Sequence, residues 1–155
     1  MGADEQVREY FSRKPSAMTL MAARDLGLPE AEVLRALGAT ELKPDAFENV
    51  MEALKGWGRV HVIVSNRGAT MEARGEFGNY SRSGPFLNVE YKGLDLHLRP
   101  EGIAAIFLFE KPAHTDGRTT RMLQFYDRQG DAVMKAVCPE GKEDAFRGLL
   151  VYSLR

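Results

Sequence analysis

The sequence predicts an α+β fold, in which an N-terminal helical segment is followed by a large, mainly antiparallel sheet and a C-terminal helix. Two observations support this prediction. Apolar residues recur at helical spacing over residues 1 to about 56. From Arg59 onward, apolar and polar residues alternate with the period of two that is typical of half-buried strands. Helical and strand-like segments therefore occupy separate parts of the chain, as in α+β proteins.

Composition places the chain among ordinary globular proteins, and we expect a single domain over residues 1–155. The 21 Lys and Arg residues nearly balance the 22 Asp and Glu residues, so there is no general electrostatic case for a nucleic-acid or anionic-membrane partner. The longest apolar stretch, residues 102–109, is too short to span a membrane. Cys138 is the single cysteine, which excludes an internal disulfide and suits a reducing cytoplasm. Met1–Gln6 does not resemble a secretory signal.

Four helices are expected in residues 1–56, which form a helical subregion. The first carries Val7 and Tyr10 on one face and ends before Pro15. The others are expected over Ser16–Gly27 with Ser16 as the cap, over Pro29–Leu37 with Gly38 as the stop, and from Pro44 to about Gly56.

Seven strands joined as hairpins are expected in the rest of the chain, and together they predict one large sheet. In the first strand, Val60, Val62 and Val64 are expected on one face, and His61, Ile63 and Ser65 on the other. The expected strand ranges are 59–65, 71–77, 87–91, 94–99, 103–109, 119–126 and 132–138, the segment 78–85 is a loop, and a helix covers about 142 to 154.

The second and third helices have the spacing of a helix-turn-helix unit, which makes a DNA-binding regulator an alternative function. Ala22, Gly27 and Val33 occupy its small, turn and core positions. However, residues 1–56 carry seven basic and ten acidic side chains, and a net charge of −3 repels a polyanion. A purely structural role for this helical segment is therefore favoured over DNA binding.

Motifs of common enzymes are missing from the sequence: it has no Gly-x-Ser-x-Gly elbow, no HExxH and no phosphate-binding glycine loop. Cys138 has no base nearby in sequence. The three histidines, His61 and His97 on polar strand faces and His114 in a turn, are typical of solvated or structural residues when taken one by one. Taken alone, these patterns leave the function of the domain undetermined.

Several short segments resemble, in their order, the ChuX/HutX family of cytoplasmic haem-utilisation carriers. They are Trp57–Val60, Gly75–Phe77, His97–Glu101, Phe109–Pro112 and Gln124–Gly130, preceded by Met18–Ala23, Leu34–Leu37 and Phe47–Val50. The resemblance implies a homodimer whose chain is similar to one half of the duplicated HemS/ChuS haem proteins. It also implies haem as the cofactor and a carrier or storage role in haem iron utilisation, and we therefore expect a protein that is not an enzyme. A haem-degrading enzyme is the third alternative, after the DNA-binding regulator.

The resemblance also implies the site residues. Family members carry two strand histidines associated with haem; the later one falls at His97, and Ser65 stands at the position of the earlier one. His97 is thus the expected iron ligand, because a serine hydroxyl ligates iron poorly. His61 does not replace Ser65, since four residues along a strand separate the two by ~13 Å.

Haem propionates need cationic partners. Arg99, two residues beyond His97 on the same strand face, is the first candidate, and Arg121 and Lys135 on later strands are further ones. Each of these side chains taken alone is more typical of a solvated sheet face. The segment Ala113–Gly117 also stands where family members have a Phe-rich stretch.

Overall fold

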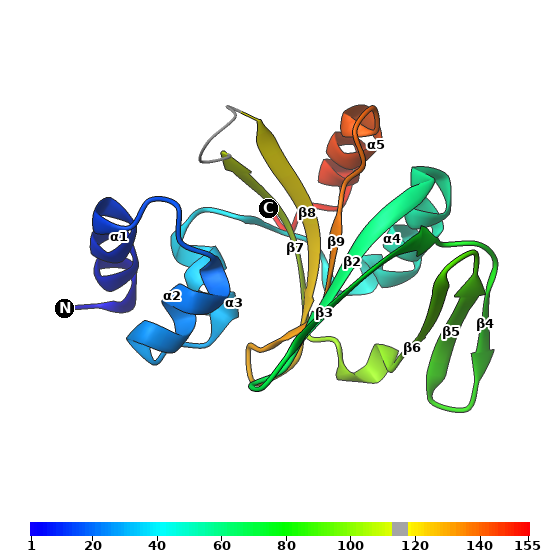
Figure 1. The fold of residues 1–155 in the computed structure, drawn as a ribbon, viewed down its shortest axis with the longest axis horizontal. Coiled ribbons are helices and arrows are strands. Elements are labelled where there is room, and N and C mark those ends of the chain that lie inside the picture. The colour runs from blue at the N-terminus through cyan, green and yellow to red at the C-terminus, as the bar shows by residue number, and fades with distance from the viewer. Residues whose placement is uncertain (113–117) are drawn as a thin grey trace.

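The structure is a computed structural model, and it describes residues 1–112 and 118–155. Three helices lie together at one end of the molecule (Figure 1): α1 (Ala3–Arg13), α2 (Thr19–Leu26) and α3 (Glu30–Ala36). We call α1–α3 the helical unit. The expected α+β architecture is confirmed, with these helices first, antiparallel sheet next and a helix near the C-terminus.

The second helix begins three residues later than predicted, and Ser16 does not cap it. The N–H of Ala17 donates to the Lys14 carbonyl, so the intervening residues form a turn, and α2 begins at Thr19 without a side-chain cap. Its end agrees with the prediction, because Gly27 adopts a left-handed conformation with φ of 68°.

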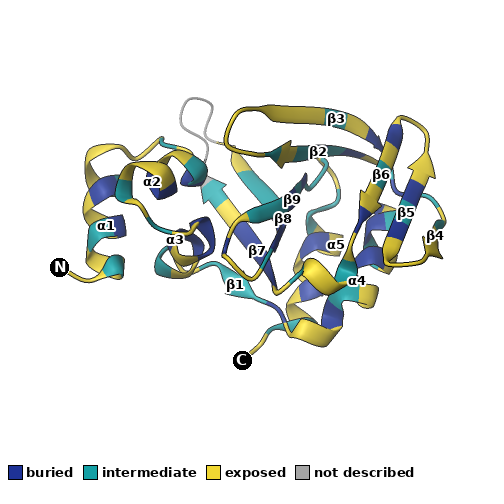
Figure 2. Ribbon diagram, turned by 90° about the horizontal axis from the view of Figure 1, so that it is seen from below, coloured by how far each residue is buried: buried dark blue, intermediate teal, exposed yellow. Residues whose placement is uncertain are grey.

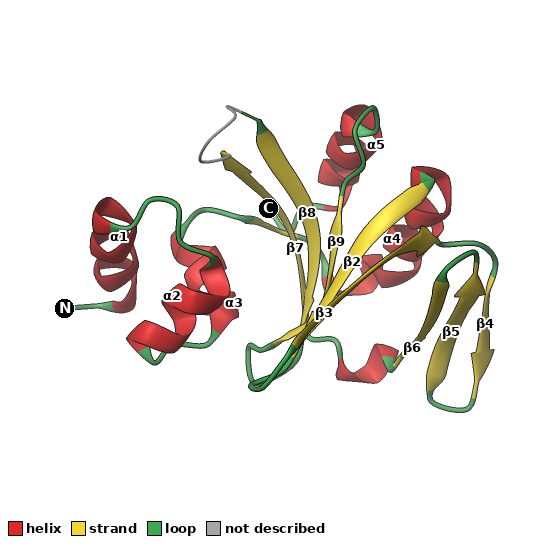
Figure 3. Cartoon of the chain, in the orientation of Figure 1, coloured by secondary structure: helices red, strands yellow, loops and turns green. Residues whose placement is uncertain are grey.

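A six-stranded antiparallel sheet forms the centre of the molecule (Figure 3). Its order is β1-β7-β8-β9-β2-β3. The strands are β1 (Thr40–Glu41), β2 (Arg59–Ser65), β3 (Thr70–Glu76), β7 (Ala105–Pro112), β8 (Thr119–Tyr126) and β9 (Ala132–Val137). The bounds of β2 and β8 agree with the sequence prediction.

A second sheet of three strands corrects the prediction of one sheet with seven strands. It contains β4 (Tyr80–Ser83), β5 (Phe86–Tyr91) and β6 (Leu94–Leu98) in that order. The expected loop 78–85 contains β4, whose polar residues give no alternating pattern, and the expected helical subregion contains the short strand β1. β1 is defined by pairing with the distant strand β7, and β4 by pairing with β5 across a tight turn, and neither strand has an alternating pattern of its own that would reveal it.

Helices cover one face of the six-stranded sheet. Val60 and Val62 are buried there under α4 (Phe47–Leu54) and α5 (Glu143–Gly148). Val64 continues the same face but is exposed, because the end of β2 extends past this core. The C-terminal helix is shorter than expected: it ends at Gly148, and a 3-10 helix, Leu149–Tyr152, follows.

The helical unit packs against the opposite face of the sheet. Ala31 and Leu34 of α3 are buried against Phe107 and Tyr126, whose rings meet edge to face. Beyond α3, towards β2 and β3, this face is less covered (Figure 2). No helix among the described residues has the length and apolar character needed to cross a membrane.

The two sheets meet through glycines. A Cβ atom added to Gly75 of β3 would lie 2.7 Å from the Lys92 carbonyl oxygen, and one added to Gly93 would lie 2.7 Å from the Arg74 carbonyl oxygen. Lys92 and Gly93 form the turn between β5 and β6, with φ of 30° and 93°. Backbone therefore touches backbone where the small sheet joins the large one.

Candidate functional site

A cleft of about 960 Å³ lies between the helical unit and the sheet. Its walls are α2 and the start of α3, the β2–β3 turn with Ser65 at its edge, and the β8–β9 turn. The N–H of Ala31 donates to the Gly130 carbonyl at 3.0 Å, which fixes α3 against the β8–β9 turn. Ligand pockets in proteins usually measure about 300–1,000 Å³, so this volume suits a large organic molecule.

Ser65, one of the predicted site residues, lines this cleft. It is the last residue of β2, and its hydroxyl lies 2.9 Å from the hydroxyl of Thr70 on β3. A side chain at this position therefore borders the cleft that α2 lines from the other side. A larger group at residue 65 would enter the cleft.

Two arginines that sequence reasoning missed also line the cleft. Arg24 of α2 donates from Nη2 to the Asn66 carbonyl at 2.8 Å and so links the helical unit to the β2–β3 turn. Arg67 stands in the same turn, which the Asn66 side chain stabilises by accepting from the N–H groups of Gly68 and Ala69. Arg24 and Asn66 are 42 residues apart, and no local pattern predicts their contact.

A buried ion pair supports the wall of the cleft. Glu30 on α3 is only 2% exposed, and its Oε2 accepts from Lys135 Nζ at 2.5 Å and from Thr19 Oγ1 at 2.7 Å. Lys135 was a candidate for a propionate partner, but its ammonium group is engaged with Glu30 and does not line the cleft.

The remaining predicted cations also lie elsewhere. Arg121 forms an ion pair with Glu110 at 3.1 Å. Arg99 stacks over the Phe86 ring, with its guanidinium carbon 5.9 Å from the ring centroid. Arg99, which directly follows β6, is exposed like His97 and lies on the same side of the small sheet, because Phe86 and the His97 partner Asn88 share one face of β5.

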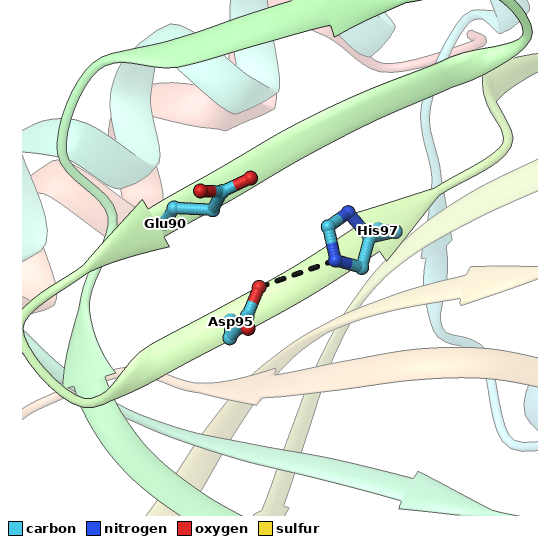
Figure 4. Close-up of side chains that lie close together, drawn as sticks. All are labelled: Glu90, Asp95 and His97. Carbon is cyan, nitrogen blue, oxygen red and sulfur yellow. Dashed lines mark ion pairs between the residues drawn. The ribbon is translucent and has the colours of Figure 1, made fainter.

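His97, the predicted iron ligand, lies on this exposed face of the small sheet and not in the cleft. Its Nδ1 is 2.6 Å from Asn88 Oδ1, and its Nε2 is 3.1 Å from Asp95 Oδ1 (Figure 4). Glu90 stands opposite Asp95, and one ligand atom from each of Glu90, Asp95 and His97 lies within 4.8 Å of the others. Both ring nitrogens of His97 thus face oxygen atoms, and an iron atom that bound Nε2 would first have to displace the Asp95 carboxylate.

A single chain therefore does not bring Ser65 and His97 into one cleft. Of the other histidines, His61 points its Nε2 at Glu72 Oε1, 2.6 Å away, and it does not line the cleft either. His114 lies outside the described residues. The role of His97 in ligating iron stays a prediction from the family resemblance.

Cys138 is not arranged as a nucleophile. Burial raises the pKa of its thiol to about 11, and Sγ donates to the carbonyl oxygen of Lys142 at 3.4 Å. The thiol is therefore protonated at neutral pH, which agrees with its interpretation as a small core or rim residue.

Comparison with known structures gives close agreement in fold. ChuX superposes with a TM-score of 0.80 at 22% identity, over 94% of this chain and 96% of ChuX. ChuS from Escherichia coli O157:H7, described as a heme degrading enzyme, gives a TM-score of 0.85 at 24% identity, over 98% of this chain and 47% of the ChuS chain. Holo-PhuS from Pseudomonas aeruginosa, described as a heme-binding protein, gives a TM-score of 0.82 at 24% identity, over 97% of this chain and 45% of the PhuS chain.

The fold thus corresponds to about one half of ChuS or PhuS, which confirms the expected similarity to a HemS-type half. A comparison with curated protein sequences finds no match. The haem utilisation family ChuX/HutX matches residues 40–148, which is well over half of the sequence. This chain belongs to the ChuX/HutX haem utilisation family.

Proposed function

We propose that this protein binds haem and acts as an intracellular haem carrier or storage protein in haem iron utilisation. The observation that carries the proposal is the cleft of about 960 Å³ at Ser65, in a chain that belongs to a haem utilisation family. Leu20, Leu28 and Pro29 provide apolar wall for a macrocycle, and two arginines provide positive charge. A haem site requires both features.

We place the haem in this cleft. The cleft walls formed by described residues offer no imidazole, thiol, thioether or phenol to the iron. Ferric haem bound there is therefore expected to be high-spin, with water as an axial ligand. This placement is compatible with His97 as an iron ligand only if His97 comes from a second copy of the chain.

The replacement Ser65→His tests the placement. A histidine at the edge of the cleft supplies the missing imidazole, so we expect it to strengthen haemin binding by about tenfold or more and to shift the absorption spectrum towards low-spin. The matched control Ser65→Ala, which removes only the hydroxyl group, should bind like the natural protein. Both are measured by titrating haemin and following the Soret band.

The variant His97→Ala tests the alternative, in which His97 ligates the iron. The family resemblance predicts that it abolishes haem binding, whereas haem in the cleft of a single chain predicts little change. If His97→Ala abolishes binding and Ser65→His has no effect, the haem lies on the exposed face of the small sheet and our placement is wrong. If haemin shifts no Soret band with any of these proteins, haem is not the ligand.

We further propose that the protein carries haem without degrading it. ChuS, which contains a similar half, is described as a heme degrading enzyme, so the two activities occur on one fold. We expect the Soret band of the haem-loaded protein to persist when a reductant and oxygen are added. Loss of the band with release of iron would identify a haem-degrading enzyme instead.

A homodimer in the cytoplasm is the proposed assembly. β3 forms one edge of the six-stranded sheet, and next to it the exposed side chains of Val64 and Met71 lie directly opposite each other on adjacent strands. Unpaired edges and exposed apolar side chains favour association with another chain. Light scattering should give twice 17.3 kDa, and a monomer at working concentration would contradict this assembly.

The helix packing favours a haem carrier over a DNA-binding regulator. In a helix-turn-helix protein the second helix must be free to enter the major groove. Here the corresponding helix, α3, buries Ala31 and Leu34 against Phe107 of the sheet, and Glu30 is buried in its ion pair. We therefore infer that nucleic acid is not the partner.

A further inference from the structure

We propose that Arg24 and Arg67 bind the two carboxylates of the tetrapyrrole, so that the cleft selects a ligand with free propionate groups. This inference rests on the proposed haem-binding function. It names the feature of the ligand that the protein recognises, and it assigns two side chains that lie outside the site implied by the family resemblance. Arg24 also precedes the part of the chain that matches the family, residues 40–148.

Arg24 is held in position and still has donors to offer. One nitrogen, Nη2, donates to the Asn66 carbonyl at 2.8 Å, which brings the guanidinium group of α2 over the β2–β3 turn. A guanidinium group carries five N–H donors in a planar fork that matches a carboxylate. No other described residue uses a donor of Arg24, so the donors that Asn66 leaves unused are available to a ligand in the cleft.

Arg67 has no hydrogen-bond or ion-pair partner within residues 1–112 and 118–155. It stands next to Asn66, whose side chain closes the turn through bonds to two backbone N–H groups. The turn therefore fixes the backbone of Arg67 while its side chain is uncommitted. Arg24 and Arg67 approach the cleft from the same side, because Arg24 binds the carbonyl of the residue that precedes Arg67.

The acidic side chains of the cleft favour one orientation of a ligand that carries carboxylates at one end. The charge of Glu30 is offset by Lys135 at 2.5 Å. Asp127 and Asp131 lie on the β8–β9 turn, which is a different wall from the one that carries the arginines, and Asp127 already accepts two backbone N–H groups. A ligand with carboxylates at one end therefore fits with that end towards Arg24 and Arg67 and away from the aspartates.

The test compares haemin with haemin dimethyl ester, in which both propionates are neutral. Both arginines are exposed, so each charged contact is screened, and we expect about a fivefold loss of haemin affinity for each of Arg24→Gln and Arg67→Gln. The natural protein should bind the ester about 25-fold more weakly than haemin, and the double variant should bind both probes equally. Raising the salt concentration should weaken haemin binding and leave ester binding unchanged.

Two further variants serve as controls. Arg128→Gln removes an exposed positive charge from the adjacent β8–β9 turn, outside the cleft lining, and should not change the affinity for haemin. Asp131→Asn removes a negative charge that lines the cleft, so it should strengthen haemin binding by about twofold to threefold and have no effect on the ester.

Three results would overturn the inference. If the natural protein binds haemin and the ester equally well, the propionates are not recognised, but the proposed haem-binding function is unaffected. This comparison uses the natural protein alone, so it does not depend on whether any variant folds. If Arg24→Gln and Arg67→Gln bind haemin like Arg128→Gln, other groups hold the propionates. If the natural protein binds neither probe, the proposed haem-binding function itself is wrong, and the inference falls with it.

Discussion

We expect Lys135→Met to lower the free energy of unfolding by about 3–5 kcal/mol at neutral pH, because it leaves a buried carboxylate without its charged partner. Lys135 Nζ lies 2.5 Å from Glu30 Oε2, and Glu30 is 2% exposed. Methionine fills a similar volume but provides no charge, and the neutral Thr19 hydroxyl would remain as a donor to the Glu30 side chain. The other Glu30 oxygen, Oε1, already has no partner among the described residues.

One neighbouring group reduces this loss slightly. Burial and the nearby Lys135 charge hold the pKa of the Lys111 ammonium below its usual value. Removing Lys135 relieves that repulsion, but Lys111 is tied to the Ala17 carbonyl at 2.5 Å and is not placed to replace Lys135 at Glu30.

Urea denaturation followed by circular dichroism measures the effect of Lys135→Met. The control Lys43→Met, at an exposed position where no described residue contacts the ammonium group, should change stability by no more than about 0.5 kcal/mol. The double variant Glu30→Leu/Lys135→Met removes both charges and should recover most of the loss, since replacing a whole buried ion pair by apolar groups is often nearly neutral. Equal stability of Lys135→Met and Lys43→Met would mean that the ion pair contributes nothing.

The second large effect is expected for Trp57→Ala, which should lower the free energy of unfolding by about 3–5 kcal/mol. Trp57 is 1% exposed and joins α4 to β2, and its ring packs against Phe146 of α5 with a centroid distance of 6.3 Å. Alanine would leave a cavity where two helices meet the central sheet, and the surrounding backbone closes such a cavity only in part.

Trp57→Phe separates ring packing from hydrogen bonding. The indole Nε1 is buried without an acceptor in the described part of the chain, so phenylalanine removes an unsatisfied donor while it keeps an aromatic ring. We therefore expect Trp57→Phe to cost less than about 1.5 kcal/mol. Thermal and urea unfolding of both variants give the comparison, and similar losses for Phe and Ala would show that the larger indole ring is itself required.

The sequence predicts those parts of the fold that depend on local patterns. Alternation of apolar and polar residues locates β2 to the residue, and Gly27 marks the end of α2 because only glycine adopts its backbone conformation at little cost. It does not predict β4, because Tyr80–Ser83 is a polar segment that becomes a strand only by pairing with β5. The division into two sheets depends on pairing between strands far apart in the sequence, such as β2 with β9, which no local pattern contains.

The candidate site is harder to predict for a related reason. Ser65 was found through the family resemblance, and the structure places it at the cleft. Arg24 and Glu30 were missed as site residues because their neighbours in space are 42 and 105 residues away in sequence. A charged residue on a short helix resembles any solvated residue until the element that it faces is known.

The glycine contact between the two sheets has a practical consequence for protein engineering. Hairpin tips are the usual sites for inserting a tag or a fluorescent reporter, because most of them project into solvent. The Lys92–Gly93 tip does not suit this use: Gly93 would place a Cβ atom 2.7 Å from the Arg74 carbonyl oxygen, and Gly75 has no free space either. An insertion there would wedge the sheets apart, so a reporter belongs at the opposite hairpin, where an added Cβ at Gly84 would meet no atom within 4 Å.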